Sequence, residues 1–162
     1  MKNDHLKPRE TSLAVGEIAP VFTLQDQDRK EWKLSEAVKL GDVALCFYPL
    51  AFTGVCGTEM KCVNDEMASW TKKGATVIGI SCDSTAVQKA WADSMGLKQT
   101  LLADMHRHVC KAYGLYWADL NVSSRGTVVV GKNASGQGKV KWSQSRQPGN
   151  AMKFDDVLAA LS

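Results

Sequence analysis

The chain has 162 residues, close to the ~150 of a typical domain, so we expect one folded domain spanning residues 1–162. Hydrophobic residues make up 44% and charged residues 23% of the chain, a composition that supports a packed core and excludes a disordered protein. The net charge is +3 and the basic residues are scattered along the sequence, which argues against nucleic acid as a partner.

The predicted elements, in chain order, begin after a flexible or extended segment at residues 1–13. Two short strands at 19–24 and 31–34, joined by a polar turn, indicate an N-terminal β-hairpin. Near-continuous apolar runs are typical of strands buried on both faces, and they occur at 43–48, 76–80 and 127–130. Apolar residues at helical spacing predict helices at 53–73, 84–95, 107–113 and 152–161. A further strand is expected near residues 139–142.

This alternation of strands and helices indicates an α/β fold, with helices flanking a central, mostly parallel sheet that has an antiparallel edge. The first sixteen residues lack the apolar run of a secretory signal. The longest apolar stretch, 43–52, contains Pro49 and is shorter than the ~20 residues of a membrane span. The five cysteines are an odd number, which indicates at least one free thiol. We therefore expect a cytoplasmic protein without a membrane span, whose chemistry involves thiols.

Cys56 is the most informative cysteine because it follows the strand at 43–48 and lies in the first turn of the next predicted helix. Unpaired backbone N–H groups and the positive end of the helix dipole stabilise a thiolate at such a position. The thiolate is the nucleophilic form of cysteine. Cys56 also lies four residues before Met60, on the helix side expected to be buried. Its position alone therefore fits a reactive thiolate and an inert core thiol equally well.

The residues before Cys56 distinguish these two interpretations. They form the pattern Pro49-x-x-x-Thr53-x-x-Cys56, in which Thr53 is placed to bring a hydroxyl beside the sulfur and Pro49 to shield the loop from water. This pattern resembles the active-site loop of the peroxiredoxin (AhpC/TSA) family of thiol peroxidases, which implies a thioredoxin-like fold. Glu59 and the strand that carries Arg125 resemble further parts of the family pattern. The resemblance covers about residues 14–160, and the segments most similar to the alkyl hydroperoxide reductase E type are 52–56, 111–116, 125–127 and 147–149.

The resemblance implies that Cys56 reduces hydrogen peroxide or an organic hydroperoxide to water or alcohol. The oxygen that leaves when a thiolate breaks the O–O bond gathers negative charge, which fixed donors must stabilise. We expect Arg125 to be that donor and to keep Cys56 ionised, and Thr53 to orient the peroxide. By resemblance, Glu59 orients the guanidinium of Arg125. The alternative interpretations are a solvated strand-end cation for Arg125 and a favourable acid in the early turns of a helix for Glu59.

The attack leaves a sulfenic acid on Cys56, which another thiol must resolve. Cys62 points about 120° away from Cys56 around the helix and lies ~9 Å further along it, so the two cannot bond while the helix is intact. Cys82 follows the strand at 76–80 and is the second candidate, although Ser81 to Ser84 is equally well a polar helix entry. Cys46 alternates within a buried strand and is expected to be a core thiol.

We therefore expect a cycle with one cysteine, in which an external thiol regenerates Cys56 through a mixed disulfide. The external thiol would be thioredoxin, a glutaredoxin-like protein or a low-molecular-weight thiol. The alternatives are a two-cysteine cycle through Cys62 or Cys82, a redox sensor that binds partners when Cys56 is oxidised, and a thioredoxin-like dithiol oxidoreductase. The last would carry a second cysteine where this chain has Glu59.

We expect no metal and no cofactor. His106 and Cys110 are four residues apart and would share a helix face, but two ligands do not complete a metal site, so we expect Cys110 on a partly exposed helix. Family members that resemble this chain commonly dimerise near the active-site loop, so we expect a homodimer. Phe52, Trp91 and Trp117 are aromatic residues available to such an interface, although core positions would explain them too.

Overall fold

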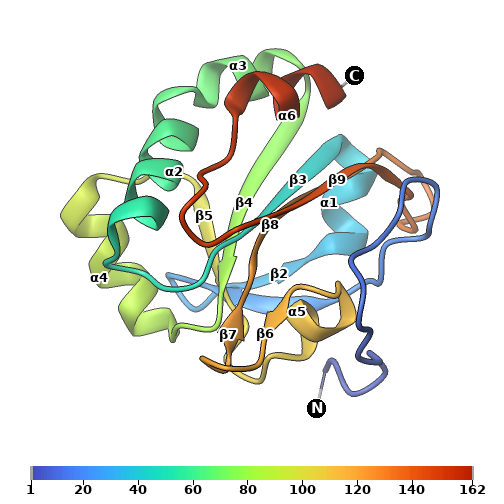
Figure 1. The fold of residues 1–162 in the computed structure, drawn as a ribbon. Coiled ribbons are helices and arrows are strands. Elements are labelled where there is room, and N and C mark those ends of the chain that lie inside the picture. The colour runs from blue at the N-terminus through green and yellow to red at the C-terminus, as the bar shows by residue number, and fades with distance from the viewer. Residues whose placement is uncertain (1, 162) are drawn as a thin grey trace.

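The computed structural model describes residues 2–161 and has a seven-stranded sheet at its centre (Figure 1). The strands of this sheet lie in the order β2-β1-β5-β4-β3-β8-β9. Their bounds are β1 Thr23–Asp26, β2 Glu31–Lys33, β3 Asp42–Phe47, β4 Ala75–Ser81, β5 Thr100–Ala103, β8 Arg125–Val130 and β9 Val140–Arg146. The helices are α1 Leu34–Leu40, α2 Gly54–Asp65, α3 Met67–Lys72, α4 Thr85–Met95, α5 His108–Ala112 and α6 Phe154–Ala160. A separate small ribbon pairs β6 Tyr116–Trp117 with β7 Val122–Ser123.

The three central strands of the sheet are parallel and the pairs on both flanks are antiparallel. β3 pairs with β4, and β4 with β5, in parallel. β3 pairs with β8, and β8 with β9, in antiparallel fashion on one flank. On the other flank the β1–β2 hairpin joins the sheet through an antiparallel β1–β5 pair. The expected α/β architecture with an N-terminal hairpin is therefore present, while the antiparallel part of the sheet is larger than a single edge.

Helices cover both faces of the sheet and divide the core in two (Figure 1). Successive side chains of a strand point to opposite faces. Along β3, Val43, Leu45 and Phe47 accordingly pack with α1 and α5 on one face. Ala44 and Cys46 pack on the other face, which carries α2, α3, α4 and α6. A side chain on α2 therefore meets the sheet on the opposite face from a side chain on α5.

The predicted helix at 53–73 is two helices in the structure. The pattern of apolar residues continues through the segment, but the chain leaves helical geometry at Glu66, where φ is −102° and ψ is 15°. The break lets α3 place Trp70 in the core beside α6, where its ring meets that of Phe154 edge-on at 4.8 Å between centroids. Helix α1, strand β5 and the β6–β7 ribbon are further elements that the sequence pattern did not predict.

The N-terminal segment lies against the core rather than away from it. The Asn3 side chain exchanges two hydrogen bonds with the backbone of Thr23, and the backbone N–H of Arg9 donates to the carbonyl of Lys111. Leu13 is buried with the residues of the α1 and α5 side. No helix in the described part of the chain is long and apolar enough to cross a membrane.

Candidate active site

Cys56 lies where the buried strand β3 passes into helix α2. The strand ends in the core, Pro49 is buried directly after it, and the loop reaches Thr53, the N-cap residue of α2. Cys56 is in the first turn of this helix and only 2% exposed. It lies on the buried side of α2, together with Glu59 and Met60. The helix start therefore holds the sulfur against the sheet, close to unpaired backbone N–H groups.

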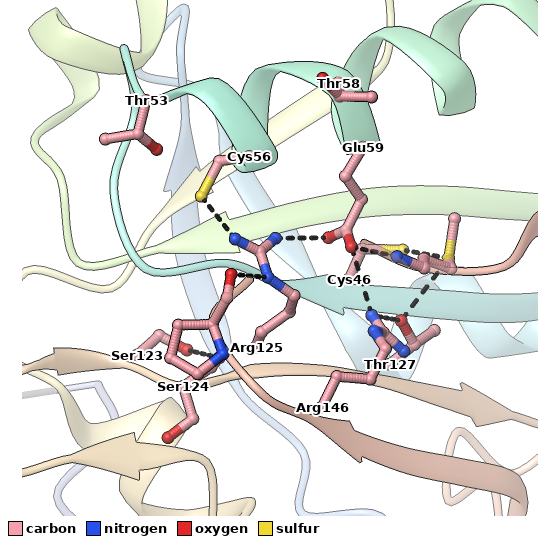
Figure 2. A network of polar contacts seen from close by, with 12 residues as sticks. Cys46, Thr53, Cys56, Thr58, Glu59, Ser123, Ser124, Arg125, Thr127 and Arg146 are labelled. Atoms are coloured by element: carbon pink, nitrogen blue, oxygen red, sulfur yellow. Dashed lines mark hydrogen bonds and ion pairs between the residues drawn. The ribbon is translucent and has the colours of Figure 1, made fainter. Parts of the chain in front are cut away.

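Arg125, the first residue of β8, contacts the Cys56 sulfur and two further groups with its guanidinium (Figure 2). Its Nη2 donates to Cys56 Sγ at 3.1 Å, and its Nε donates to the carbonyl of Pro148 at 3.0 Å. Its Nη1 lies 3.3 Å from Oε1 of Glu59. The side chain is 2% exposed, so water screens these contacts only weakly. The sulfur of Cys56 therefore has a buried guanidinium as its hydrogen-bond donor.

Glu59 is fully buried and contacts two arginines from adjacent strands (Figure 2). Oε2 accepts the backbone N–H of Met152 at 2.6 Å and lies 3.5 Å from Nη2 of Arg146. Arg125 and Arg146 are directly paired in the β8–β9 register, an arrangement that repels two like charges. The carboxylate of Glu59 lies between them, in ion-pair contact with both guanidinium groups, and offsets that repulsion.

Arg146 is the site residue that sequence reasoning missed. Besides its contact with Glu59, it donates to Oγ1 of Thr127 at 2.8 Å. Arg125 and Thr127 are two residues apart along β8 and therefore face the same side of the sheet, toward α2. The available signal was a second arginine on a strand next to that of Arg125. Because the predicted strand ended at residue 142, that signal was lost.

The loop before α2 is tightly held at two points. The hydroxyl of Thr53 donates to the carbonyl of Leu50 at 2.7 Å, and the backbone N–H of Ala51 donates to Oδ2 of Asp83 at 2.9 Å. Between them, Phe52 adopts φ of 60°, a left-handed conformation that costs a bulky residue of the order of 1–3 kcal/mol. Thr53 is exposed and its proton is engaged, so its oxygen can accept a hydrogen bond from an incoming ligand.

The other cysteines lie away from the Cys56 sulfur. Cys62 is exposed on the outer side of α2. Cys46 is buried, and its thiol donates to Sδ of Met152 at 3.8 Å. Cys82 packs on the α1 and α5 face of the sheet, opposite to the face of Cys56, and its Sγ lies 3.9 Å from that of Cys110. Cys110, expected on a partly exposed helix, is fully buried.

The structure also places the three aromatic residues considered for an interface. Trp91 is a core residue, 1% exposed. Phe52 is 60% exposed, and its ring centroid lies 6.4 Å from that of Trp91. Trp117 is half-buried on β6. The core interpretation therefore holds for Trp91 and is wrong for Phe52, because the left-handed backbone at residue 52 turns its side chain outward.

The fold and this site together define a class of proteins: thiol-dependent redox enzymes built on a thioredoxin-like scaffold. The sequence matches the model of the AhpC/TSA family over residues 15–142. It is 33% identical over 155 residues to alkyl hydroperoxide reductase E of Mycobacterium tuberculosis, an alignment that covers 93% of this chain and 99% of that protein. It is 30% identical over 157 residues to the chloroplastic 2-Cys peroxiredoxin BAS1 of Hordeum vulgare, covering 91% and 73% of the two chains.

Solved structures agree with the sequence comparisons. Peroxidoxin BcpB from Mycobacterium tuberculosis superposes with a TM-score of 0.80 at 26% identity, covering 91% of this chain and 96% of that one. The reduced 2-Cys peroxiredoxin of Plasmodium vivax superposes with a TM-score of 0.81 at 27% identity, covering 90% and 79%. The chain belongs to the AhpC/TSA family, as a peroxiredoxin with a thioredoxin-like fold and thiol-dependent hydroperoxide reductase activity.

The environments of Cys46 and Cys62 predict opposite reactivities toward an alkylating reagent. Burial, with the nearby charge of Glu59, raises the pKa of the Cys46 thiol to about 12, so this thiol stays protonated at neutral pH. Cys62 is exposed on α2. In the native protein at pH 8 we expect iodoacetamide to modify Cys62 within minutes and Cys46 only after unfolding. Peptide mapping of timed samples measures both, and rapid labelling of Cys46 in the folded protein would contradict its placement.

Glu59→Gln should destabilise the protein, because two buried arginines lose the carboxylate between them. Breaking a buried ion pair on one side costs about 3–5 kcal/mol. We expect the free energy of unfolding in urea to fall by about 3 kcal/mol, while the glutamine keeps the size of the side chain and an acceptor for the Met152 N–H. Glu36→Gln is the matched control: it removes an exposed ion pair with Lys39, for which about 0–1 kcal/mol is expected. Equal losses in the two variants would show that Glu59 carries no buried charge.

Proposed function

We propose that Cys56 is the peroxidatic residue of this hydroperoxide reductase and that it works in a one-cysteine cycle. The observation that carries the proposal is the contact between Cys56 Sγ and the buried guanidinium of Arg125, at 3.1 Å. This contact gives the sulfur a fixed positive neighbour at a helix start, which is the environment that a nucleophilic thiolate needs.

In the reaction, the Cys56 thiolate attacks one oxygen of the hydroperoxide and the O–O bond breaks. The sulfur is oxidised to a sulfenic acid, and the other oxygen leaves as an alkoxide or hydroxide that takes a proton to become alcohol or water. Arg125 stabilises the charge that gathers on the leaving oxygen, since its orientation is fixed by Glu59 and by the Pro148 carbonyl.

Thr53 and Pro49 complete the proposed site. The Thr53 hydroxyl donates its hydrogen bond to the carbonyl of Leu50, so its oxygen lone pairs can accept a hydrogen bond from the O–H of the hydroperoxide and aim the peroxide at the sulfur. Pro49 is buried between β3 and the loop, where it has no N–H to offer water and supports the loop that carries Thr53.

The positions of the other cysteines support resolution by an external thiol. Cys62 faces outward on the same intact helix that holds Cys56 inward. Cys82 lies in the opposite half of the core. An external thiol would attack the sulfenic sulfur, form a mixed disulfide with loss of water, and leave as a disulfide when a second thiol restores Cys56. The external thiol would be thioredoxin, a glutaredoxin-like protein or a small thiol.

The test exposes the reduced protein once to one equivalent of hydrogen peroxide without added thiol. The protein is then denatured, its free thiols are alkylated, and its intact mass is measured. We expect the gain of one oxygen, mapped to Cys56, with the other four thiols alkylated. Loss of two hydrogens and a peptide joining Cys56 to Cys62 or Cys82 would establish a two-cysteine cycle instead. Oxidation of another cysteine, with Cys56 intact, would overturn the assignment.

The proposal extends to assembly and location. Leu50 and Phe52, 38% and 60% exposed, place apolar surface on the active-site loop, which supports a homodimer formed beside the site. We further propose that residues 1–162 act as a single domain and that the protein works in the cytoplasm, where thiol reductants are plentiful. Sedimentation at micromolar concentration with Phe52→Glu as a comparison tests the dimer.

A further inference from the structure

Two cysteines that the proposed cycle does not use lie in contact on the far side of the sheet. Cys82 directly follows β4 and Cys110 lies in the middle of α5. Their sulfur atoms are 3.9 Å apart, about the distance of van der Waals contact. Cys110 is fully buried and Cys82 is 9% exposed. The pair belongs to a different half of the core from Cys56.

The surroundings hold the Cys110 sulfur as a neutral thiol. Its hydrogen bond with Cys82, its burial and the charge of Asp104 all raise the pKa of Cys110. The Cys110 thiol also approaches the carbonyl of Arg107 at 3.5 Å, as a donor. Cys82 is the more exposed residue of the pair and is therefore the one that an oxidant from solvent meets first.

We propose that Cys82 and Cys110 form an intramolecular disulfide when hydroperoxide accumulates, so that the protein carries a second oxidation site besides Cys56. The Cys82 thiolate first attacks a hydroperoxide, whose O–O bond breaks to leave a Cys82 sulfenic acid and an alcohol or water. The Cys110 sulfur then attacks the Cys82 sulfur, the S–S bond forms, and the hydroxyl leaves as water with the Cys110 proton. In sum, one hydroperoxide is reduced by two electrons and two thiols become one disulfide.

The site favours a disulfide over a bound metal, the other chemistry open to it. Cys82, Cys110 and Asp104 place their ligand atoms within 4.8 Å of one another, which is three of the four ligands of a structural zinc site. However, the two Asp104 oxygens already accept the backbone N–H groups of Val109 and Cys110, at 3.2 and 2.8 Å. A metal would also require two thiolates beside this carboxylate. A disulfide is neutral and fits the apolar half-core in which both sulfurs lie.

The pair is linked to the active-site loop through the residue next to Cys82. Asp83 accepts the N–H of Ala51 at 2.9 Å and the hydroxyl of Ser81 at 2.7 Å. A disulfide length is ~2.05 Å, so bond formation draws the two sulfurs together by almost 2 Å. Any movement of the Cys82 backbone that accompanies this approach also moves Asp83, which holds the N–H of Ala51. Oxidation of the pair would thus change the position of the loop that carries Thr53 and leads to Cys56.

The experiment uses the full chain with Cys56→Ser and Cys62→Ser, which removes the peroxidatic and the exposed thiol and leaves Cys46, Cys82 and Cys110. The reduced protein is treated with excess hydrogen peroxide, free thiols are alkylated in denaturant, and peptides are mapped. We expect the majority of chains to lose two hydrogens, to contain a Cys82–Cys110 peptide and to carry one alkylated residue, Cys46. Reduction with dithiothreitol should restore three alkylated thiols.

Two comparisons make the result decisive. Addition of Cys110→Ser should abolish the disulfide and leave oxygen on Cys82. If Cys82 and Cys110 both stay reduced in the parent variant, or gain oxygen without joining, the proposal is wrong. Stoichiometric zinc in the purified wild-type protein, lost in Cys82→Ser and Cys110→Ser, would overturn it in favour of a metal site. Because Cys56 is absent from the test, failure of the Cys56 assignment and failure of this proposal are separate results.

Discussion

Replacing Cys56 with serine is expected to lower thiol-dependent hydroperoxide consumption by roughly a thousandfold or more, the scale of loss seen when the nucleophile of a covalent mechanism is removed. A serine hydroxyl is not ionised at neutral pH and its oxygen cannot form a sulfenic acid. The fold should persist, because the two side chains are nearly equal in size and the guanidinium of Arg125 can donate to the serine oxygen as it does to the sulfur. Peroxide consumption with a saturating thiol donor measures the effect, and circular dichroism confirms the fold.

Cys62→Ser is the matched control for this prediction, because it removes a thiol from the same helix but from its exposed side. In the one-cysteine cycle its turnover should stay within twofold of the wild type. If Cys56→Ser consumes peroxide at the native rate, the peroxidatic thiol is a different one. A large loss in Cys62→Ser alone would instead indicate that Cys62 resolves the sulfenic acid.

The second large effect is expected for Arg125. Removing a single fixed donor from the developing oxyanion costs roughly 10²–10³ in rate in other enzymes, about 2.7–4 kcal/mol. Arg125→Lys keeps the positive charge but offers one point donor in place of a guanidinium that contacts Cys56, Glu59 and Pro148 together. We expect kcat/KM for hydrogen peroxide to fall about a hundredfold in Arg125→Lys, and at least as far in Arg125→Ala.

Arg146→Lys separates the direct role of Arg125 from the general effect of charge. Arg146 contacts the same carboxylate, Oε2 of Glu59, and is well buried, but has no contact with the Cys56 sulfur. Its loss in kcat/KM should be tenfold or less. Urea unfolding of both variants shows whether either rate change reflects a loss of folded protein. A similar loss in the two folded variants would mean that Arg125 acts only through the charge of the cluster.

The elements nearest the site were predictable from local patterns, and their limits were not. The apolar runs of β3, β4 and β8 and the helix after Thr53 were expected from the sequence. The helix break at Glu66 was missed because tertiary packing of Trp70, and not a proline or glycine, ends α2. Strand β5 has only four residues, and its pairing with β1 and β4 depends on partners distant in sequence.

The same distinction holds within the site. Cys56, Thr53 and Pro49 are close in sequence and form a recognisable pattern, and Arg125 and Glu59 were added by resemblance. Arg146 and the backbone groups of Pro148 and Met152 were not assigned roles. Arg146 ends β9, and Pro148 and Met152 reach the site through the course of the chain after this strand. Backbone carbonyl and N–H groups cannot be recognised from the types of the side chains.

The contacts of Pro148 and Met152 have a consequence for how the protein matures during synthesis. Cys56 is made before Arg125, and before the carbonyl of Pro148 and the N–H of Met152 that hold Arg125 and Glu59. A nascent chain that has emerged only as far as α4 holds a cysteine with no guanidinium beside it and a glutamate with no arginine. Domains fold as units and long-range contacts form late, so the thiol should gain its reactivity only after the segment that carries Arg125, Pro148 and Met152 leaves the ribosome.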